Sequence, residues 1–214
     1  FFLEKKTKNQ LTDVAMAMYV AASVALILNG FVLGVMMTSK KLRRKLSVMF
    51  LVHQCVCDFV GSVLIIICYA IDITYNGNVP DGMLGSLYCK ILWSQFIAYG
   101  ALNAGVFNTV FLSVERYLAV VHPLKYKKIA TRSKFKKASI FCWVLGIVLN
   151  SPYIPMSTPI DGVCVFVDLL DSGSLTKAYN ASVTSISFLL PLLIIMVLYA
   201  QMFNTLHKRK QGIA

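Results

Sequence analysis

The chain is organised around the stretch Ser113-Val114-Glu115-Arg116-Tyr117-Leu118-Ala119-Val120-Val121-His122-Pro123-Leu124. An acid and an arginine stand side by side in it, after an apolar run over residues 91–114 that contains no charged residue. A run of this length crosses a bilayer core as a helix. A charged pair at the end of such a helix is costly to place there, so it marks a functional site by default.

The composition of the whole chain agrees with a membrane protein. The 214 residues are 57% hydrophobic and 14% charged, with a mean hydropathy of +0.70. Soluble domains carry about 25% charged residues. We therefore predict an all-α fold, a polytopic helical bundle whose partner is the lipid bilayer.

The positions of the basic residues explain the net charge of +12. Sixteen of the 21 Lys and Arg residues lie in segments 40–45, 116–137 and 208–210, at alternate ends of the apolar runs. This is the positive-inside pattern, which predicts an extracellular N-terminus, and it does not resemble a nucleic-acid groove. No cleavable signal peptide is visible, and Phe1 indicates a sequence that begins mid-chain.

Five spans are predicted within one transmembrane domain that covers residues 1–214. They run over about 13–38, 46–73, 89–121, 138–153 and 178–206. The third span is about 50 Å long at 1.5 Å per residue, so it must tilt or protrude. One of its faces carries mostly small residues at helical spacing, as expected of a central helix that neighbours approach closely. This face consists of Ala98, Ala101, Gly105, Thr109, Leu112 and Arg116.

The motifs, taken in chain order, resemble one known family. Glu115-Arg116-Tyr117 followed by His122-Pro123-Leu124 resembles the signature that closes the third helix of rhodopsin-like (class A) G-protein-coupled receptors. Further matches occur in order at Asn29 with Val32, at Asp58, at Trp143 with Pro152 and at Pro191 with Tyr199. The motifs of the sixth and seventh helices are absent from this sequence. The resemblance therefore implies a seven-transmembrane receptor type with five spans present: a fragment, a truncated gene model or a natural short form.

The resemblance also implies a function at the plasma membrane. Such a receptor transmits an extracellular ligand signal to a heterotrimeric G protein through the Glu115-Arg116-Tyr117 switch. Glu115 would hold Arg116 inactive, Tyr199 would swing in to hold Arg116 in the active state, and Leu124 would insert into the G protein.

The candidate ligand pocket comprises Gln95, Ala98 and Tyr99. The position that holds an acid in amine receptors falls on Ala98, or on Phe96 if the helix is shifted by two residues. Neither is acidic, so a monoamine is disfavoured. The acidic outer loops favour a peptide and leave a lipid open.

Two of the six cysteines lie on the oxidising side, which allows one bridge. The family has such a bridge at the positions matching Cys89 and Cys164. Cys89 lies 27 positions before Arg116, two more than is usual in the family, which predicts a local bulge near Trp93.

Two polar clusters are expected inside the bundle. Asp58 matches a family acid that holds a sodium ion beside the first-helix amide, here Asn29, although the third helix offers only Ala101 and Gly105 nearby. A protonated or amide-paired acid is the alternative. We also hypothesise a buried network. It joins His53, Asn108 and Trp143.

The sequence fits other protein classes less well. A transporter fragment predicts inverted repeats or matched Gly/Pro interruptions, which the sequence lacks. A membrane enzyme needs a second reactive side chain facing Asp58 or His53, and no such set or metal-ligand spacing is present. A non-signalling short receptor form remains open. The sequon at Asn180 abuts the fifth span, and we interpret it as fortuitous.

Overall fold

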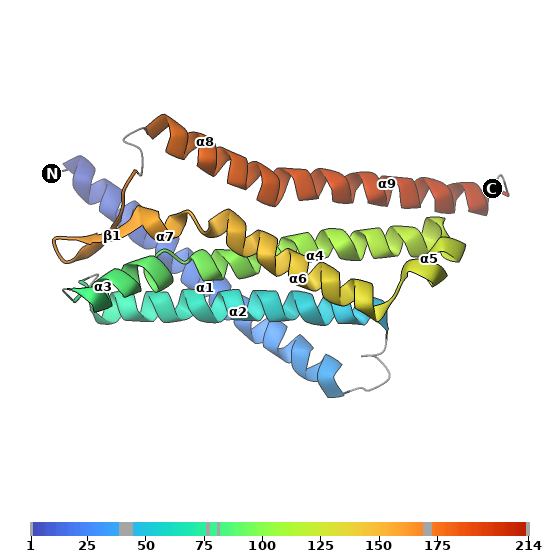
Figure 1. The fold of residues 1–214 in the computed structure, drawn as a ribbon, viewed down its shortest axis with the longest axis horizontal. Helices are drawn as coiled ribbons and strands as arrows, with labels where there is room; N and C mark the ends of the chain where they lie inside the picture. Colours follow the sequence, from blue (N-terminus) through green and yellow to red (C-terminus); the bar gives the residue numbers. More distant parts are fainter. Residues whose placement is uncertain (1, 39–44, 76–77, 81, 169–172, 213–214) are drawn as a thin grey trace.

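The computed structural model describes residues 2–38, 45–75, 78–80, 82–168 and 173–212, with side chains from residue 16 onward. Within this part, five helical segments are long and apolar enough to cross a membrane. They run alternately along the long axis, so that α1 starts at the end that carries the strand β1 and α9 finishes at the opposite end (Figure 1). The predicted polytopic helical bundle is confirmed.

The first two spans follow the predicted pattern. Helix α1 covers Phe2–Thr38 and α2 covers Leu46–Thr74. The third span is a longer rod built from α3 (Met83–Leu87), the π-helical segment η2 (Tyr88–Trp93) and α4 (Phe96–Val121). Helix α2 ends one residue after the predicted 73, so Asp72 lies in its last turn.

The predicted loop at 122–137 is largely helical, which corrects the sequence reading. Pro123 ends α4 because the residue before a proline disfavours the helical conformation, and the same proline starts α5 (Pro123–Ile129). Thr131 then caps α6 (Arg132–Asn150) by accepting a hydrogen bond from the Lys134 N–H at 3.4 Å. The fourth span therefore begins six residues before the predicted 138.

The connection after α6 contains a β-hairpin that the sequence reading did not include. Pro152 precedes the short α7 (Tyr153–Met156), and β1 (Ser157–Ile160) pairs antiparallel with β2 (Val163–Phe166). The two turn residues, Asp161 and Gly162, both have positive φ angles, of 50° and 75°. An Asp-Gly pair suits such a turn because its twist matches that of the strands.

The last rod begins before the predicted residue 178. It consists of α8 (Gly173–Thr184), the π-helical segment η3 (Ser185–Leu189) and α9 (Leu190–Lys210). Pro191 is buried at the start of α9 and has no N–H to donate, which accounts for the widened turn before it.

The core forms around α4, which packs against α2, α6 and α9. One buried cluster of α2, α4 and α6 contains Cys57, Ala104, Phe107 and Cys142. A second cluster of α1, α2 and α4 contains Ala22, Ile65 and Ala98. The predicted central helix is confirmed, and the exposed apolar side chains of α1 and α9 face outward, as a lipid environment requires.

Candidate functional site

The bundle has two chemically different ends. We call the end with the Cys89–Cys164 bond the disulfide end, and the opposite end, with Arg116, α5 and the last turn of α9, the basic end. The disulfide links η2 to β2, as the resemblance implied. Of the basic segment at 40–45, only Lys45 lies within the described residues.

The predicted bulge near Trp93 is present. The helix widens through η2 and is interrupted at Ser94 and Gln95 before α4 begins. The Ser94 hydroxyl donates to the Lys90 carbonyl at 2.7 Å and accepts from the Phe96 N–H at 3.4 Å. Gln95 adopts a left-handed conformation with φ 53°, which is uncommon for a residue with a side chain. The two additional residues are therefore absorbed at the wall of a cavity.

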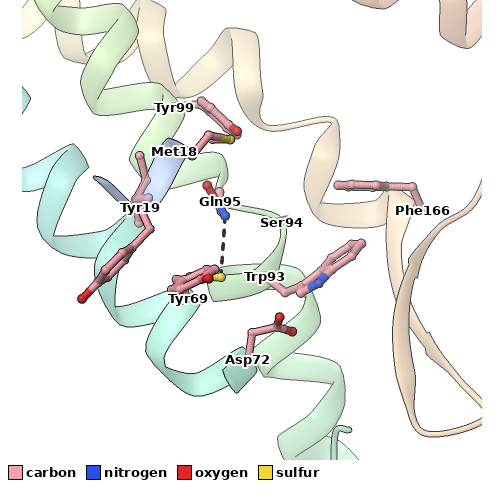
Figure 2. A pocket seen from close by; sticks show the side chains of 11 residues that line it. Met18, Tyr19, Tyr69, Asp72, Trp93, Ser94, Gln95, Tyr99 and Phe166 are labelled. Carbon is pink, nitrogen blue, oxygen red and sulfur yellow. Dashed lines mark hydrogen bonds between the residues drawn. The ribbon is translucent and has the colours of Figure 1, made fainter. Parts of the chain in front are cut away.

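This cavity, which we call the acidic lobe, has a volume of about 290 Å³. It lies at the disulfide end between α1, α2, η2 and β2 (Figure 2). Its described lining includes five aromatic rings and one carboxylate. Its lining consists of Met18, Tyr19, Ile65, Cys68, Tyr69, Asp72, Trp93, Ser94, Gln95, Tyr99 and Phe166.

A second cavity of about 490 Å³, the neutral lobe, adjoins the first. The two lobes share Ser94, Tyr99 and Phe166 as wall residues. The neutral lobe is otherwise lined from α4, α6, α7, α8 and η3, without a carboxylate, lysine or arginine among its described lining residues. Its polar groups are amides and hydroxyls. They include Asn103, Asn150, Thr184 and Ser187.

Two of the three predicted pocket residues line these lobes. Gln95 lines the acidic lobe, and Tyr99 lines both. Ala98 does not line either lobe, because it is buried against Ala22 and Ile65. Sequence reasoning missed Asp72, although its position three residues after Tyr69 on one helix face was a usable signal.

At the basic end, Glu115 is buried and fastens two other elements to α4. Its Oε1 accepts hydrogen bonds from the Ser47 hydroxyl of α2 at 2.8 Å and from the Tyr126 hydroxyl of α5 at 2.6 Å. Its Oε2 lies 3.7 Å from Nε of Arg116 and has no hydrogen-bond partner among the described residues.

Arg116 lies in a different environment from its neighbour. Its side chain is 52% exposed, whereas that of Glu115 is 6% exposed. The inference that Arg116 faces the bundle interior is therefore wrong for the described part of the chain, because no described helix covers that end of the small-residue face. Tyr117 packs edge to face against the His122 ring.

The other two residues of the predicted switch are also exposed. Leu124 on α5 is 78% exposed and Tyr199 on α9 is 53% exposed. Tyr199 makes no hydrogen bond to another described residue, so the expected contact with Arg116 is not formed in this conformation. Near the end of α9, however, Arg209 Nη1 donates to the Val120 carbonyl at 3.0 Å and joins α9 to the end of α4.

The phenol of Tyr126 is held in its protonated form. Partial burial and the hydrogen bond to the Glu115 carboxylate raise the pKa of Tyr126 from its ordinary value of 10.0 to about 12. The hydroxyl thus remains a donor to Glu115 over the whole physiological range of pH.

The hypothesised network between His53, Asn108 and Trp143 is formed. His53 Nδ1 lies 2.8 Å from Asn108 Oδ1, and the Trp143 indole donates to His53 Nε2 at 3.1 Å. A neutral ring with its proton on Nδ1 satisfies both contacts. Asn108 is fully buried and also donates to the Phe50 carbonyl at 2.9 Å and to Gln54 Oε1 at 3.1 Å.

Asp58 is paired with an amide. Gln54 Nε2 donates to its two carboxylate oxygens at 3.2 and 3.1 Å, while Asn29 donates to the Ala25 carbonyl of its own helix. The neighbouring α4 positions, Ala101 and Gly105, carry no side-chain oxygen. The described residues thus fit a sodium ion poorly, since a hard cation prefers several oxygen ligands. The sodium site stays a prediction.

The arrangement defines a class of protein: a multi-pass helical membrane protein with a cavity at one end and a buried acid beside an exposed arginine at the other. Comparison with known proteins makes the assignment more specific. The family described as "7 transmembrane receptor (rhodopsin family)" matches residues 28–213. The chain belongs to this family.

The chain is similar to several curated receptors. It is 27% identical to the Tachykinin-like peptides receptor 86C of Drosophila melanogaster over 86% of this chain and 37% of that protein. It is 28% identical to the Growth hormone secretagogue receptor type 1 of Oryctolagus cuniculus, over 71% and 43% of the two chains. It is 24% identical to the Galanin receptor 2a of Danio rerio, over 81% of this chain and 46% of that protein. The chain spans less than half the length of each of these relatives.

Proposed function

We propose that the protein is a plasma-membrane receptor that passes the signal of an extracellular peptide to a heterotrimeric G protein. In this proposal the disulfide end faces outward and the basic end faces the cytoplasm. The positive-inside rule supports this orientation, because the last turn of α9 and the helix α5 carry clusters of lysine. A disulfide is also expected on the oxidising side.

A peptide ligand is supported by two observations. The relatives include a receptor named for tachykinin-like peptides and one named for galanin. The two adjoining lobes, of about 290 and 490 Å³, give room for more than one side chain and expose both aromatic rings and amides to a ligand. The position that would mark an amine receptor, Ala98, is buried away from both lobes.

The buried Glu115 beside the exposed Arg116 is the observation that carries the signalling proposal. Glu115 fixes α2 and α5 to α4 and holds Arg116 nearby through its second oxygen. A ligand that binds one packing of the helices more tightly shifts the population towards it. Loss of the Glu115 contacts would free Arg116 for the G protein, with Leu124 inserted beside it and Tyr199 closing on the arginine.

The test is substitution of Arg116 in the whole protein. We expect Arg116→Ala to abolish ligand-stimulated nucleotide exchange on the G protein while ligand affinity changes little, because Arg116 is remote from the two lobes. Arg132→Ala is the matched control, since Arg132 is an exposed arginine at the same end. Retained exchange in Arg116→Ala, or equal loss in Arg132→Ala, contradicts the proposed switch.

A further inference from the structure

We infer that the acidic lobe is a subsite for a cationic group, the guanidinium or amine of a basic residue in the ligand, with Asp72 as its counter-ion. This inference rests on the proposed function, because it names the chemistry of the ligand that the receptor would recognise. It was not foreseen from the sequence, in which Asp72 was not among the candidate pocket residues.

The polar side chains of this lobe include a single charged one. Asp72 carries a carboxylate, and Gln95 Oε1 is buried without a hydrogen-bond partner. No lysine, arginine or histidine belongs to the described lining. The only charge among the described lining residues is therefore negative, so the lobe favours a positively charged group.

Gln95 is held in place by strained backbone. Its left-handed conformation at the start of α4 places the amide in the lobe, where Nε2 donates to the Cys68 sulfur at 3.7 Å (Figure 2). That contact occupies the donor side of the amide, and Oε1 is buried. Left-handed residues other than glycine are costly and cluster at ligand-binding positions, so the conformation is consistent with a recognition role.

The aromatic rings of the lobe suit a cation. Tyr19 stacks on Tyr69 with ring centroids 4.7 Å apart. The ring centroids of Trp93 and Phe166, which also line the lobe, lie 4.6 Å apart. The faces of aromatic rings, tryptophan above all, attract a guanidinium or ammonium group. Figure 2 shows Asp72 beside Tyr69 and Trp93, so that one cation can meet the carboxylate and the π faces together.

Other ligand groups match the lobe less well. An anion would meet the Asp72 carboxylate without a compensating positive charge, which is repulsive at short range. A purely apolar group would cover the lobe but leave the Asp72 carboxylate without a counter-ion. A cation with N–H donors can meet the carboxylate and the aromatic rings at once.

The experiment measures binding of a small probe to the whole protein in lipid nanodiscs. The probe is Nα-acetyl-arginine amide, and its neutral isostere Nα-acetyl-citrulline amide is the comparison. Of the two tryptophans in the sequence, Trp93 lines the lobe and Trp143 lies in α6, so tryptophan fluorescence reports on the site. We expect a saturable change with the arginine probe, absent in Trp93→Phe, and at least about tenfold weaker binding of the citrulline probe.

The decisive variants change Asp72, either removing its carboxylate or keeping it on a longer side chain. Asp72→Asn should weaken binding of the arginine probe about tenfold and abolish the preference over citrulline, whereas Asp72→Glu should keep the preference. The matched control is Asp161→Asn, at the turn of the hairpin, which removes the same charge outside both lobes and should change neither. Thermal unfolding of each variant verifies that it is folded.

Equal binding of the two probes by the unmodified protein overturns the inference, as does equal loss in Asp72→Asn and Asp161→Asn. This assay contains no G protein, so it separates the two claims. Selective arginine binding without any nucleotide exchange would contradict the proposed function alone. Peptide-stimulated exchange without arginine selectivity would contradict the cation subsite alone.

Discussion

At the scale of single residues, Glu115 and Arg116 show how neighbours in sequence acquire opposite roles. Glu115 is buried because Ser47 and Tyr126 donate to it, which compensates a charge that would otherwise be costly to bury. Arg116 remains exposed at the basic end. One residue therefore joins helices, and the other is exposed on the described surface.

The hydrogen bond from Tyr126 predicts a measurable contribution to stability. Tyr126→Phe should lower the free energy of unfolding by about 1–3 kcal/mol, because it removes a donor to a charged group. Tyr75→Phe, at an exposed tyrosine at the end of α2, should have little effect. Thermal unfolding in nanodiscs measures both.

The raised pKa of Tyr126 also fixes the sign of a pH effect. The folded state holds the Tyr126 proton more tightly than the unfolded state does. The contribution of this hydrogen bond to the free energy of unfolding is therefore fully present below pH 10 and is lost as the pH rises towards 12. The stability difference between the unmodified protein and Tyr126→Phe should shrink in that window. A difference that grows there would contradict the hydrogen bond.

Asn108 carries a second prediction at this scale. Asn108→Leu removes its bonds to His53, to Phe50 and to Gln54 and leaves buried groups unpaired, so we expect a loss of about 1–3 kcal/mol and a lower folding yield. Asn103→Leu is the matched control on the same helix, because no hydrogen bond joins its side chain to another described residue. Unchanged thermal stability of Asn108→Leu would rule out a structural role for the network.

At the scale of elements, α4 and α6 approach so closely that only glycine fits between them. A Cβ at Gly146 would lie 2.3 Å from the Gly100 carbonyl oxygen and 3.1 Å from the Ala104 nitrogen, and both atoms belong to backbone that cannot rotate away. The close contact brings Cys142 and Trp143 onto α4 and so positions the indole for His53.

Substitution of this glycine should separate the two helices. Gly146→Ala is expected to destabilise the protein by at least about 1–3 kcal/mol through overpacking. Gly34→Ala in α1 is the matched control: a Cβ there meets nothing within 4 Å, and alanine favours a helix. The measurement is thermal unfolding together with the yield of folded protein, and equal behaviour of the two variants would contradict the packing.

At the scale of the whole molecule, the disulfide joins the hairpin, which supplies part of the wall of both lobes, to the helical bundle. It ties β2 to the start of the third span, and Phe166, two residues after Cys164, forms part of the wall of both lobes. The hairpin also meets the connection after α2, where the Val79 N–H donates to the Gly162 carbonyl at 2.8 Å. The walls of both lobes therefore depend on contacts between distant parts of the chain.

Breaking this bond should destabilise the fold and disturb both lobes. Cys164→Ser is expected to cost about 2–5 kcal/mol and to weaken binding of the arginine probe. Mild reductant should have the same effect on the unmodified protein and no additional effect on Cys164→Ser. If the double variant Cys89→Ser, Cys164→Ser is much less stable than either single variant, the two sulfurs do not act as one unit.

The sequence by itself determined the order of the spans and the alternation of their basic ends, and its comparison with the family pattern indicated the bulge near Trp93 and the three members of the His53 network. Hydropathy, charge and the effects of proline act over a few neighbouring residues, so they can be read from the chain, with the family resemblance supplying the pairing of the cysteines and of the network. The start of α6 and the hairpin were missed, although Thr131 and Asp161-Gly162 were local signals for them.

Only the tertiary structure decided which side chains share an environment. It brought Asp72 of α2 to Trp93 of η2 and Phe166 of β2, it buried Ala98 away from the lobes, and it left Arg116 exposed while covering Glu115. These outcomes depend on which helices approach one another and how closely. The physical reason is that burial and pairing are set by contacts between segments far apart in sequence, which no local pattern specifies.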